Sequence, residues 1–429
     1  MKSDSYHKRR IGKRELQPAT QMMSYGYDPF MSEGAVKPPV FLTSTFAFES
    51  AEAGADYFDL VAGRRKAKAG ESGGLIYSRF NHPNLEIIED RLALLDGGEK
   101  AVVTSSGMSA IATTFMALLR PGDVIVQSQP LYGGTVTLIS GLLASWGVRR
   151  LGLPSPLTQA NLQQALSDAQ SHGRLAMVYL ETPANPTNDM IDLAMVAETV
   201  AALGTADQKP VTVCDNTLLG PMYQQPNLLG IDLCVYSLTK YVGGHSDLVA
   251  GGISGRADLI QIVRQTRSAF GTQLDPHTSW MISRSMETLG LRMERAQLSA
   301  ARIAAWLKSN PHLKCDVLHP EFDIPASSGE VFKRQCGGAG STFSFVLEPK
   351  RELAFAVLNQ LQLFKLAVSL GGSESLVCHP ASTTHSGVPA ADRDASGVSE
   401  GLVRLSIGLE DADDLIADLD QAFAAAKSA

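Results

Sequence analysis

The sequence predicts an α/β protein with a mostly parallel central sheet and a smaller C-terminal α+β domain. In the middle of the chain, short apolar runs typical of strands alternate with segments of helical periodicity, which is the pattern of a parallel sheet covered by helices. From about residue 285 this alternation stops and a long helical segment begins. A chain of 429 residues is also long enough to form two or more lobes that share a substantial core.

Six short apolar runs carry the strand prediction. They are 100–104, 123–127, 177–181, 211–215, 233–237 and 249–254. Helices are expected in the gaps, for example over 85–95, 109–119 and 195–203. Because sheets of this kind bind ligands beyond the carboxyl ends of their strands, we expect the functional residues to lie there.

The two ends of the chain lack this alternation. Residues 1–76 are interpreted as an N-terminal arm, which starts with a basic stretch at 7–14 and contains a Gly/Lys-rich insert near 62–74 that we expect to be a surface loop. No apolar segment follows the basic stretch, so a solvated arm is the favoured interpretation and a targeting role is the alternative. We place the α/β domain at 77–284 and the C-terminal α+β domain at 285–429. Within the latter we expect helices near 285–308, 352–363 and 411–425 and a strand at 341–347.

The composition argues against several classes of partner. A net charge of −7 disfavours nucleic acid and anionic membranes. No apolar run approaches the roughly 20 residues that a membrane helix needs. The five cysteines show no metal-ligand spacing, so no metal site is predicted, and their odd number suits reduced thiols in a cytoplasmic protein.

Lys240 follows a strand-like apolar run and leads into a glycine-rich turn, with Ser237 and Thr239 just before it. A lysine amine can form a Schiff base and the two hydroxyls can bind a phosphate, which are the groups that a pyridoxal-phosphate enzyme requires. A solvated lysine after an ordinary strand is the alternative. Asp215, at the end of another strand, favours the first interpretation, since a carboxylate facing a pyridine nitrogen keeps that nitrogen protonated.

A candidate phosphate site precedes these strands. The strand at 100–104 leads into Ser106, Gly107 and Met108, and a helix is expected to start there. Free backbone N–H groups at a helix N-terminus bind anions, and glycine lets an anion approach closely. An ordinary serine N-cap with a glycine turn would give the same pattern.

The chain resembles the Cys/Met-metabolism family of pyridoxal-phosphate enzymes, which holds cystathionine γ-synthases, cystathionine lyases, methionine γ-lyases and O-acylhomoserine sulfhydrylases. Seven short motifs occur in the family's order across roughly residues 36 to 420. They are 77–79 (YSR), 106–108 (SGM), 130–133 (PLYG), 181–186 (ETPANP), 215–217 (DNT), 237–240 (SLTK) and 403–406 (VRLS). The resemblance implies an aspartate-aminotransferase-like type I fold, pyridoxal 5′-phosphate as cofactor and an amino acid as substrate.

The resemblance also implies roles for the cofactor-binding residues. Lys240 would carry the cofactor and move the Cα proton, and Asp215 would face the ring nitrogen. Asn185 would contact both the 3′-oxygen of the cofactor and the substrate carboxylate. The residues that would bind the phosphate are Gly107, Met108, Ser237 and Thr239.

Tyr132 resembles the family tyrosine that stacks on the cofactor ring and assists proton transfer at the γ-leaving group. Arg404 lies in an apolar strand-like run, where a guanidinium needs a partner and pairs well with a carboxylate; the family places its substrate-carboxylate clamp there. Ser369 and Thr384 resemble further substrate-pocket residues.

In the family, the residues that match Tyr77 and Arg79 reach the phosphate of the neighbouring subunit. The resemblance therefore implies a homotetramer, built from two dimers with shared active sites. It also makes residues 1–76 an inter-subunit segment as well as an arm.

Three functions stay open. We favour γ-replacement of the cystathionine-γ-synthase type, on an O-acylhomoserine with a thiol, because Gly134 stands where methionine γ-lyases carry a reactive cysteine and is expected to leave space beside Tyr132. The alternative is a methionine or cystathionine γ-lyase, which yields 2-oxobutanoate, ammonia and a thiol. A catalytically silent protein that binds pyridoxal phosphate is the alternative of another class.

Overall fold

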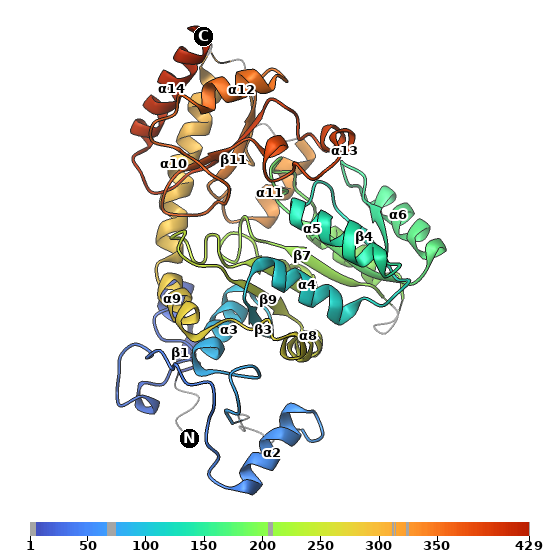
Figure 1. The fold of residues 1–429 in the computed structure, drawn as a ribbon, viewed down its shortest axis with the longest axis vertical. Coiled ribbons are helices and arrows are strands. Elements are labelled where there is room, and N and C mark those ends of the chain that lie inside the picture. Colours follow the sequence, from blue (N-terminus) through green and yellow to red (C-terminus); the bar gives the residue numbers. More distant parts are fainter. Residues whose placement is uncertain are drawn as a thin grey trace.

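The computed structural model describes residues 6–66, 74–204, 209–310, 313, 315–322 and 326–428. Three parts follow one another along the long axis of the molecule (Figure 1): the N-terminal segment, a layered part with a large sheet, and a C-terminal part with a smaller sheet. The Gly/Lys-rich insert lies partly outside the described residues, which leave out 67–73. The proposed boundaries at 77 and 285 stay a prediction.

The large sheet has seven strands in the order β3-β9-β8-β7-β6-β4-β5. β9 runs antiparallel to β3 and β8, and all the other neighbours are parallel, so the predicted mostly parallel sheet is confirmed. The bounds are β3 (Lys100–Thr104), β4 (Val124–Gln127), β5 (Arg149–Gly152), β6 (Leu175–Glu181), β7 (Val211–Asp215), β8 (Leu233–Ser237) and β9 (Gly251–Gly255). All six predicted strands are present. The apolar pattern does not predict β5, which contains two arginines and lies at the sheet edge.

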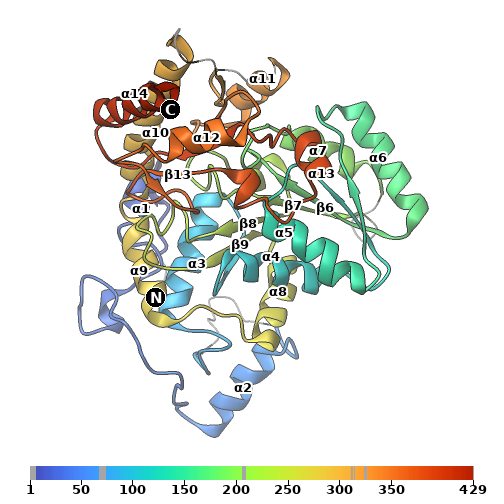
Figure 2. The same cartoon turned by 45° about the horizontal axis from the view of Figure 1, so that its top comes forward.

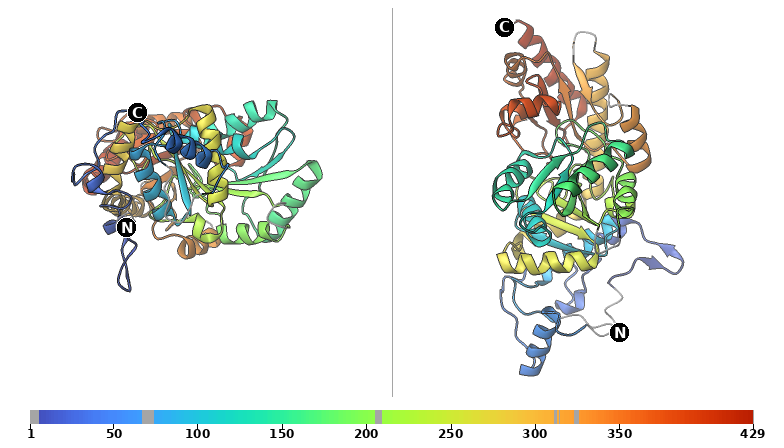
Figure 3. Two further views of the ribbon diagram at one scale, coloured as in Figure 1. Left: turned by 90° about the horizontal axis from the view of Figure 1, so that it is seen from below. Right: turned by 90° about the vertical axis from the view of Figure 1, so that its right-hand side faces the viewer.

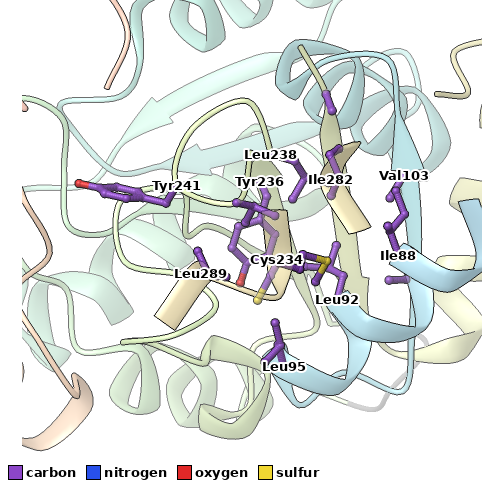
Figure 4. Close-up of a cluster of buried hydrophobic side chains, with 14 of the residues drawn as sticks. Ile88, Leu92, Leu95, Val103, Cys234, Tyr236, Leu238, Tyr241, Ile282 and Leu289 are labelled. Carbon is purple, nitrogen blue, oxygen red and sulfur yellow. The ribbon is translucent and has the colours of Figure 1, made fainter. Parts of the chain in front are cut away.

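Helices cover both faces of this sheet because successive strand residues point to opposite sides. Val213 and Val235 face α4 and α8, whereas Cys214 faces α6 and α7. Tyr236 faces α3 and α9, in the buried cluster shown in Figure 4. The bounds are α3 (Pro83–Asp96), α4 (Gly107–Leu118), α5 (Gly133–Leu138), η3 (Ile139–Leu143), α6 (Gln159–His172), α7 (Leu193–Ala201), η4 (Pro226–Leu229), α8 (Ala257–Phe270) and α9 (Pro276–Met286).

The C-terminal part is an α+β unit, as predicted. Its sheet has the order β10-β11-β14-β13-β12, and only the β12–β13 pair is parallel. The strands are β10 (Asp316–Leu318), β11 (Thr342–Val346), β12 (Lys365–Leu366), β13 (Leu376–Cys378) and β14 (Leu402–Ser406). The helices are α10 (Leu289–Ser309), α11 (Ala326–Gln335), α12 (Arg351–Leu358), η5 (Pro380–Ser382), α13 (Ala390–Ala395) and α14 (Ala412–Ser428). The predicted helix at 285–308 is therefore split, since α9 ends at Met286 and α10 begins at Leu289.

Most of the N-terminal segment lies outside the layers of helices and sheet that form the rest of the molecule. A small hairpin of β1 (Arg10–Ile11) and β2 (Arg14–Glu15) projects from the molecule (Figure 3), and α2 (Ala51–Val61) lies apart from the sheet (Figure 2). The N-terminal segment also contains two short helices, α1 (Pro18–Gln21) and η2 (Pro29–Met31). Large apolar side chains in this segment are exposed, among them Phe30, Met31, Val36 and Leu42. Within the described ranges, the chain offers no helix with the length and apolar character of a membrane span.

Candidate active site

A cavity of about 610 Å³ lies where the large sheet meets the C-terminal part. It opens at the carboxyl ends of β6, β7 and β8 and at the N-terminus of α4, which is where sheets of this type bind ligands. Eleven of the thirteen predicted site residues line it: Gly107, Met108, Tyr132, Asn185, Asp215, Ser237, Thr239, Lys240, Ser369, Thr384 and Arg404. Tyr77 and Arg79 do not.

Lys240 extends from the turn after β8 toward the C-terminal part. Its Nζ donates a hydrogen bond to Ser369 Oγ at 2.8 Å. Burial, with a smaller contribution from the positive charge of Arg404, lowers the pKa of Lys240 to about 8. At neutral pH a larger fraction of this amine is therefore neutral than in an ordinary lysine, and the neutral form is the one that acts as a nucleophile or a proton acceptor.

Arg404 lies in the middle of β14 and is only 3 % exposed. One terminal nitrogen donates to Asn185 Oδ1 at 3.0 Å and the other to the Ser369 carbonyl at 2.7 Å. Its Nε is buried without a hydrogen-bond partner, and no carboxylate of the described ranges forms an ion pair with this guanidinium. A buried cation without a counter-ion is costly, so the site is suited to a carboxylate ligand.

Asp215 ends β7 and is also buried. Its Oδ1 accepts hydrogen bonds from the backbone N–H and the hydroxyl of Thr217, at 3.1 and 2.6 Å. Burial raises the pKa of Asp215, and hydrogen bonds from Thr217 oppose that shift. Because no cation of the described chain pairs with this carboxylate, a protonated ring nitrogen would be a suitable partner.

The N-terminus of α4 has the form expected of an anion site. Ser106 caps the helix by accepting from Ser109 N–H, which leaves the N–H groups of Gly107 and Met108 directed out of the helix end. A Cβ on Gly107 would lie 2.7 Å from Cβ of Ser237, so only glycine lets α4 approach β8 this closely. The Ser237 hydroxyl makes no hydrogen bond to the described chain, whereas the Thr239 hydroxyl exchanges hydrogen bonds with the backbone of Ala250.

These residues fit pyridoxal phosphate. The free helix N–H groups and the Ser237 hydroxyl would hold the phosphate, Asp215 would face the ring nitrogen, and Lys240 would supply the amine. Thr239 lines the cavity, but it would have to share its hydroxyl between Ala250 and the phosphate.

Tyr132 is the N-cap residue of α5 and is 39 % exposed. Its ring folds back over the first turn of its own helix. A Cβ on Gly134 would lie 2.6 Å from Tyr132 Cε1 and 3.1 Å from Met108 Sδ. The expectation that Gly134 leaves open space beside Tyr132 is therefore wrong, because the tyrosine ring occupies that volume.

Tyr77 and Arg79 lie away from the cavity of their own chain. Arg79 donates to the Ser268 carbonyl at 2.6 Å and stacks over the ring of Phe80. Tyr77 forms an isolated β-bridge with Thr45 and stays partly exposed. Within one chain they contribute nothing to the cavity, and their role toward a neighbouring subunit stays a prediction.

Several cavity residues received no role from the sequence. Glu181 and Thr217 belong to quoted motifs, and Glu181 is paired in register with Asp215 across β6 and β7. A charged residue at the end of an apolar strand, next to the strand of Asp215, was the signal that could have identified Glu181. The apolar lining residues Val249 and Val368 lie in loops, and nothing in the sequence pattern marks them.

Comparison with known proteins agrees with this geometry. Residues 19–424 match the family described as Cys/Met metabolism PLP-dependent enzyme. The L-methionine gamma-lyase of Pseudomonas deceptionensis is 40 % identical over 410 residues, which cover 95 % of this chain and 97 % of that protein. The O-succinylhomoserine sulfhydrylase of Mycobacterium tuberculosis is 34 % identical over 393 residues, which cover 89 % and 90 %.

Solved structures show the same fold. Cystathionine gamma synthase from Xanthomonas oryzae pv. oryzae, in complex with cystathionine, is similar with a TM-score of 0.85 at 34 % identity, covering 97 % of this chain and all of that one. The structure of MetB from Corynebacterium glutamicum is similar with a TM-score of 0.83 at 30 % identity, covering 95 % and 98 %. The predicted type I fold is thus confirmed, and the chain belongs to the Cys/Met-metabolism family of pyridoxal-phosphate-dependent enzymes.

Proposed function

We propose that this enzyme is a γ-lyase for a sulfur amino acid of the methionine type. The overall reaction would convert methionine and water into methanethiol, ammonia and 2-oxobutanoate. This replaces γ-replacement, which the sequence favoured, as the leading hypothesis. The methionine γ-lyase relatives support the change, since they are 36–40 % identical to this chain.

The observation that carries the proposal is the distribution of charge in the cavity lining. Lys240 and Arg404 are its only cations among the described residues. Arg404 suffices for one α-carboxylate, and among the described residues of a single chain no cation besides Lys240 remains in the lining to bind the carboxylate of a second amino acid such as cysteine. The mouth is instead apolar, with Val249 and Val368 59 % and 55 % exposed, which suits an uncharged thioether.

Bound pyridoxal phosphate supplies the electron sink that makes the Cα and Cβ hydrogens of an amino acid acidic. The chain supplies the rest. Arg404, held by Asn185 and Ser369, would bind the α-carboxylate, and the neutral Lys240 amine would take up the Cα proton. Tyr132 would donate a proton to the departing sulfur, and the two valines would surround the S-methyl group.

We further propose that the active unit is a dimer within a homotetramer. Arg79 and Tyr77 would then complete the phosphate site of the neighbouring chain, and residues 1–76 would form the inter-subunit segment. The exposed apolar side chains of this segment support an interface there, because monomers rarely leave many large apolar groups exposed together.

A second candidate is γ-replacement on an O-acylhomoserine with a small uncharged thiol. Gly134 favours it, since this chain lacks the cysteine that methionine γ-lyases carry at that position. The O-succinylhomoserine sulfhydrylase relative supports it as well.

The test is product analysis with methionine as the only amino acid, for the protein loaded with pyridoxal phosphate. We expect methanethiol, ammonia and 2-oxobutanoate in equal amounts, and none of them with Lys240→Ala. If methionine gives no product while an O-acylhomoserine and a thiol are joined rapidly, the second candidate replaces the first.

A further inference from the structure

A chain of hydrogen bonds connects the cavity residues to which roles have been assigned, and it passes through Glu181. The Tyr132 N–H donates to Glu181 Oε2 at 2.7 Å, and the Asn185 N–H donates to Glu181 Oε1 at 3.0 Å. Asn185 Oδ1 then accepts from Arg404, and Arg404 binds the carbonyl of Ser369. Among the residues linked by these hydrogen bonds, Glu181 is the one to which no role in binding or catalysis has been assigned.

Glu181 is built into the rigid part of the molecule. It is the last residue of the fully buried strand β6 and is 4 % exposed. Its own N–H donates to Ser128 Oγ at 2.9 Å, which anchors its backbone to the segment after β4. The two backbone N–H groups that it binds lie in loops, one before α5 and one after β6, so the carboxylate joins two loops to the carboxyl end of the interior strand β6.

The Tyr132 N–H needs this acceptor for a simple reason. Tyr132 is the N-cap residue of α5, and its side chain does not cap that helix. An N–H group at a helix N-terminus has no intrahelical acceptor. A carboxylate at this place is also electrostatically favourable, because the N-terminal end of a helix carries partial positive charge.

We infer that Glu181 is a positioning residue, whose carboxylate fixes the backbones of Tyr132 and Asn185 relative to each other. Through this bridge, the tyrosine at the leaving-group side is held in register with the Asn185–Arg404 clamp at the carboxylate side. The two hydrogen bonds to Glu181 are sufficient evidence that its carboxylate joins these two backbones. The consequence for the two ends of the substrate rests on the proposed function.

The charge state of Glu181 depends on the groups around it. Burial and the neighbouring Asp215 carboxylate raise the pKa of Glu181 to about 8, and the hydrogen bonds from Tyr132 and Asn185 oppose this shift. Two adjacent buried carboxylates do not readily ionise together. A positive charge facing Asp215 would relieve this repulsion, so the bridge and the cofactor site are electrostatically connected.

The direct test measures hydrogen exchange at the two amides in the protein loaded with pyridoxal phosphate. Prolines at 130, 183 and 186 have no amide hydrogen, so peptides across 129–134 and 182–187 report few amides besides Tyr132 and Asn185. In Glu181→Ala we expect at least tenfold faster exchange at both amides. Glu181→Gln keeps one acceptor oxygen, so in this variant we expect faster exchange at only one of the two amides.

Asp418 provides the matched control. It is also 4 % exposed, and its carboxylate accepts the backbone N–H groups of Gln362, Leu363 and Phe364, outside the cavity. Asp418→Asn should accelerate exchange at 362–364 and leave 129–134 and 182–187 unchanged. Unchanged exchange at Tyr132 and Asn185 in both folded Glu181 variants would overturn the inference, whether or not the enzyme is a γ-lyase.

A double-mutant cycle tests how the bridge acts. If Glu181 works through Tyr132, Glu181→Gln should slow release of the γ-substituent much less in a Tyr132→Phe background than in the wild type. Equal fold-losses in the two backgrounds would show that Glu181 acts independently of Tyr132, and would contradict a positioning role at that end.

Discussion

Lys240 Nζ donates to Ser369 Oγ across the boundary between the two sheets, at 2.8 Å. Lys240 follows β8 of the large sheet, and Ser369 lies between β12 and β13 of the C-terminal sheet. The Lys240 amine is thus directed into the cavity by one part of the chain and held there by the other. The carbonyl of the same serine also accepts a hydrogen bond from Arg404, so the Lys240 amine and the Arg404 guanidinium share one anchor.

Lys240→Ala should abolish turnover, because no other lysine lines the cavity in the part of the chain that the structure describes. The variant should keep some affinity for pyridoxal phosphate through the N-terminus of α4. Borohydride treatment followed by peptide mass spectrometry should locate the cofactor on Lys240 in the wild type. A stable adduct on any other lysine would contradict the assignment.

Arg404→Ala should raise KM for the amino acid by about 10- to 100-fold, since charge-assisted hydrogen bonds contribute about 1.5–3 kcal/mol. Arg404→Lys keeps the charge but loses the planar fork, so it should recover only part of the affinity. Steady-state kinetics with an amino acid and with its carboxamide would check this. The carboxamide should be a poor substrate of the wild type, and Arg404→Ala should discriminate little between the two.

The pKa of Lys240 predicts a pH-dependent stability difference in the cofactor-free protein. Burial lowers this pKa from 10.5 to about 8, so between these values the unfolded chain binds a proton that the folded chain does not. The contribution of Lys240 to the free energy of unfolding must therefore rise as the pH increases from about 8 to 10.5. Lys240→Met should stabilise the protein most below pH 8, by up to about 3 kcal/mol, and least near pH 10. Denaturant unfolding at pH 7 and 10 measures this difference, and an equal effect at both values would contradict the shift.

Tyr132→Phe should slow release of the γ-substituent by about 10²- to 10⁴-fold, the usual range for lost general acid–base assistance. Exchange of the Cα hydrogen with solvent should continue, since Lys240 and Arg404 remain. Nuclear magnetic resonance in D₂O follows exchange and product formation in one sample. A parallel loss of both rates would place Tyr132 in substrate binding instead.

The proposed sharing of sites predicts that two inactive variants complement each other. Arg79→Ala and Lys240→Ala chains, co-refolded, should form hybrid dimers with one intact site, built from Lys240 of one chain and Arg79 of the other. Recovered activity should approach one quarter of the wild-type value for random pairing of equal amounts. Proven hybrids without activity would mean that Arg79 acts within its own chain.

Strand periodicity predicted the parallel sheet, and the ordered motifs predicted most of the cavity lining. Those predictions succeeded because apolar alternation and strand-end residues are local signals, and the carboxyl ends of parallel strands meet in space. The sequence did not predict β5, whose arginines mask the strand pattern at a sheet edge. It also misjudged Gly134, since the direction of the Tyr132 ring depends on packing that no local pattern encodes.

Glu181 shows the same limit more clearly. Its position at a strand end is visible in the sequence, but its partners are backbone N–H groups of Tyr132 and Asn185, 49 and 4 residues away. Backbone donors carry no signature of their own in a sequence. A role that consists of joining two loops can be recognised only once the fold has brought them together.

Direct competition between γ-elimination and γ-replacement shows which of the two reactions the cavity favours. An O-acylhomoserine is supplied with and without cysteine, and 2-oxobutanoate and cystathionine are quantified together over time. We expect 2-oxobutanoate and ammonia to dominate in both samples, because no cation besides Lys240 and Arg404 lines the cavity among the described residues of one chain. Formation of cystathionine at the expense of 2-oxobutanoate would contradict this expectation and establish γ-replacement as the reaction.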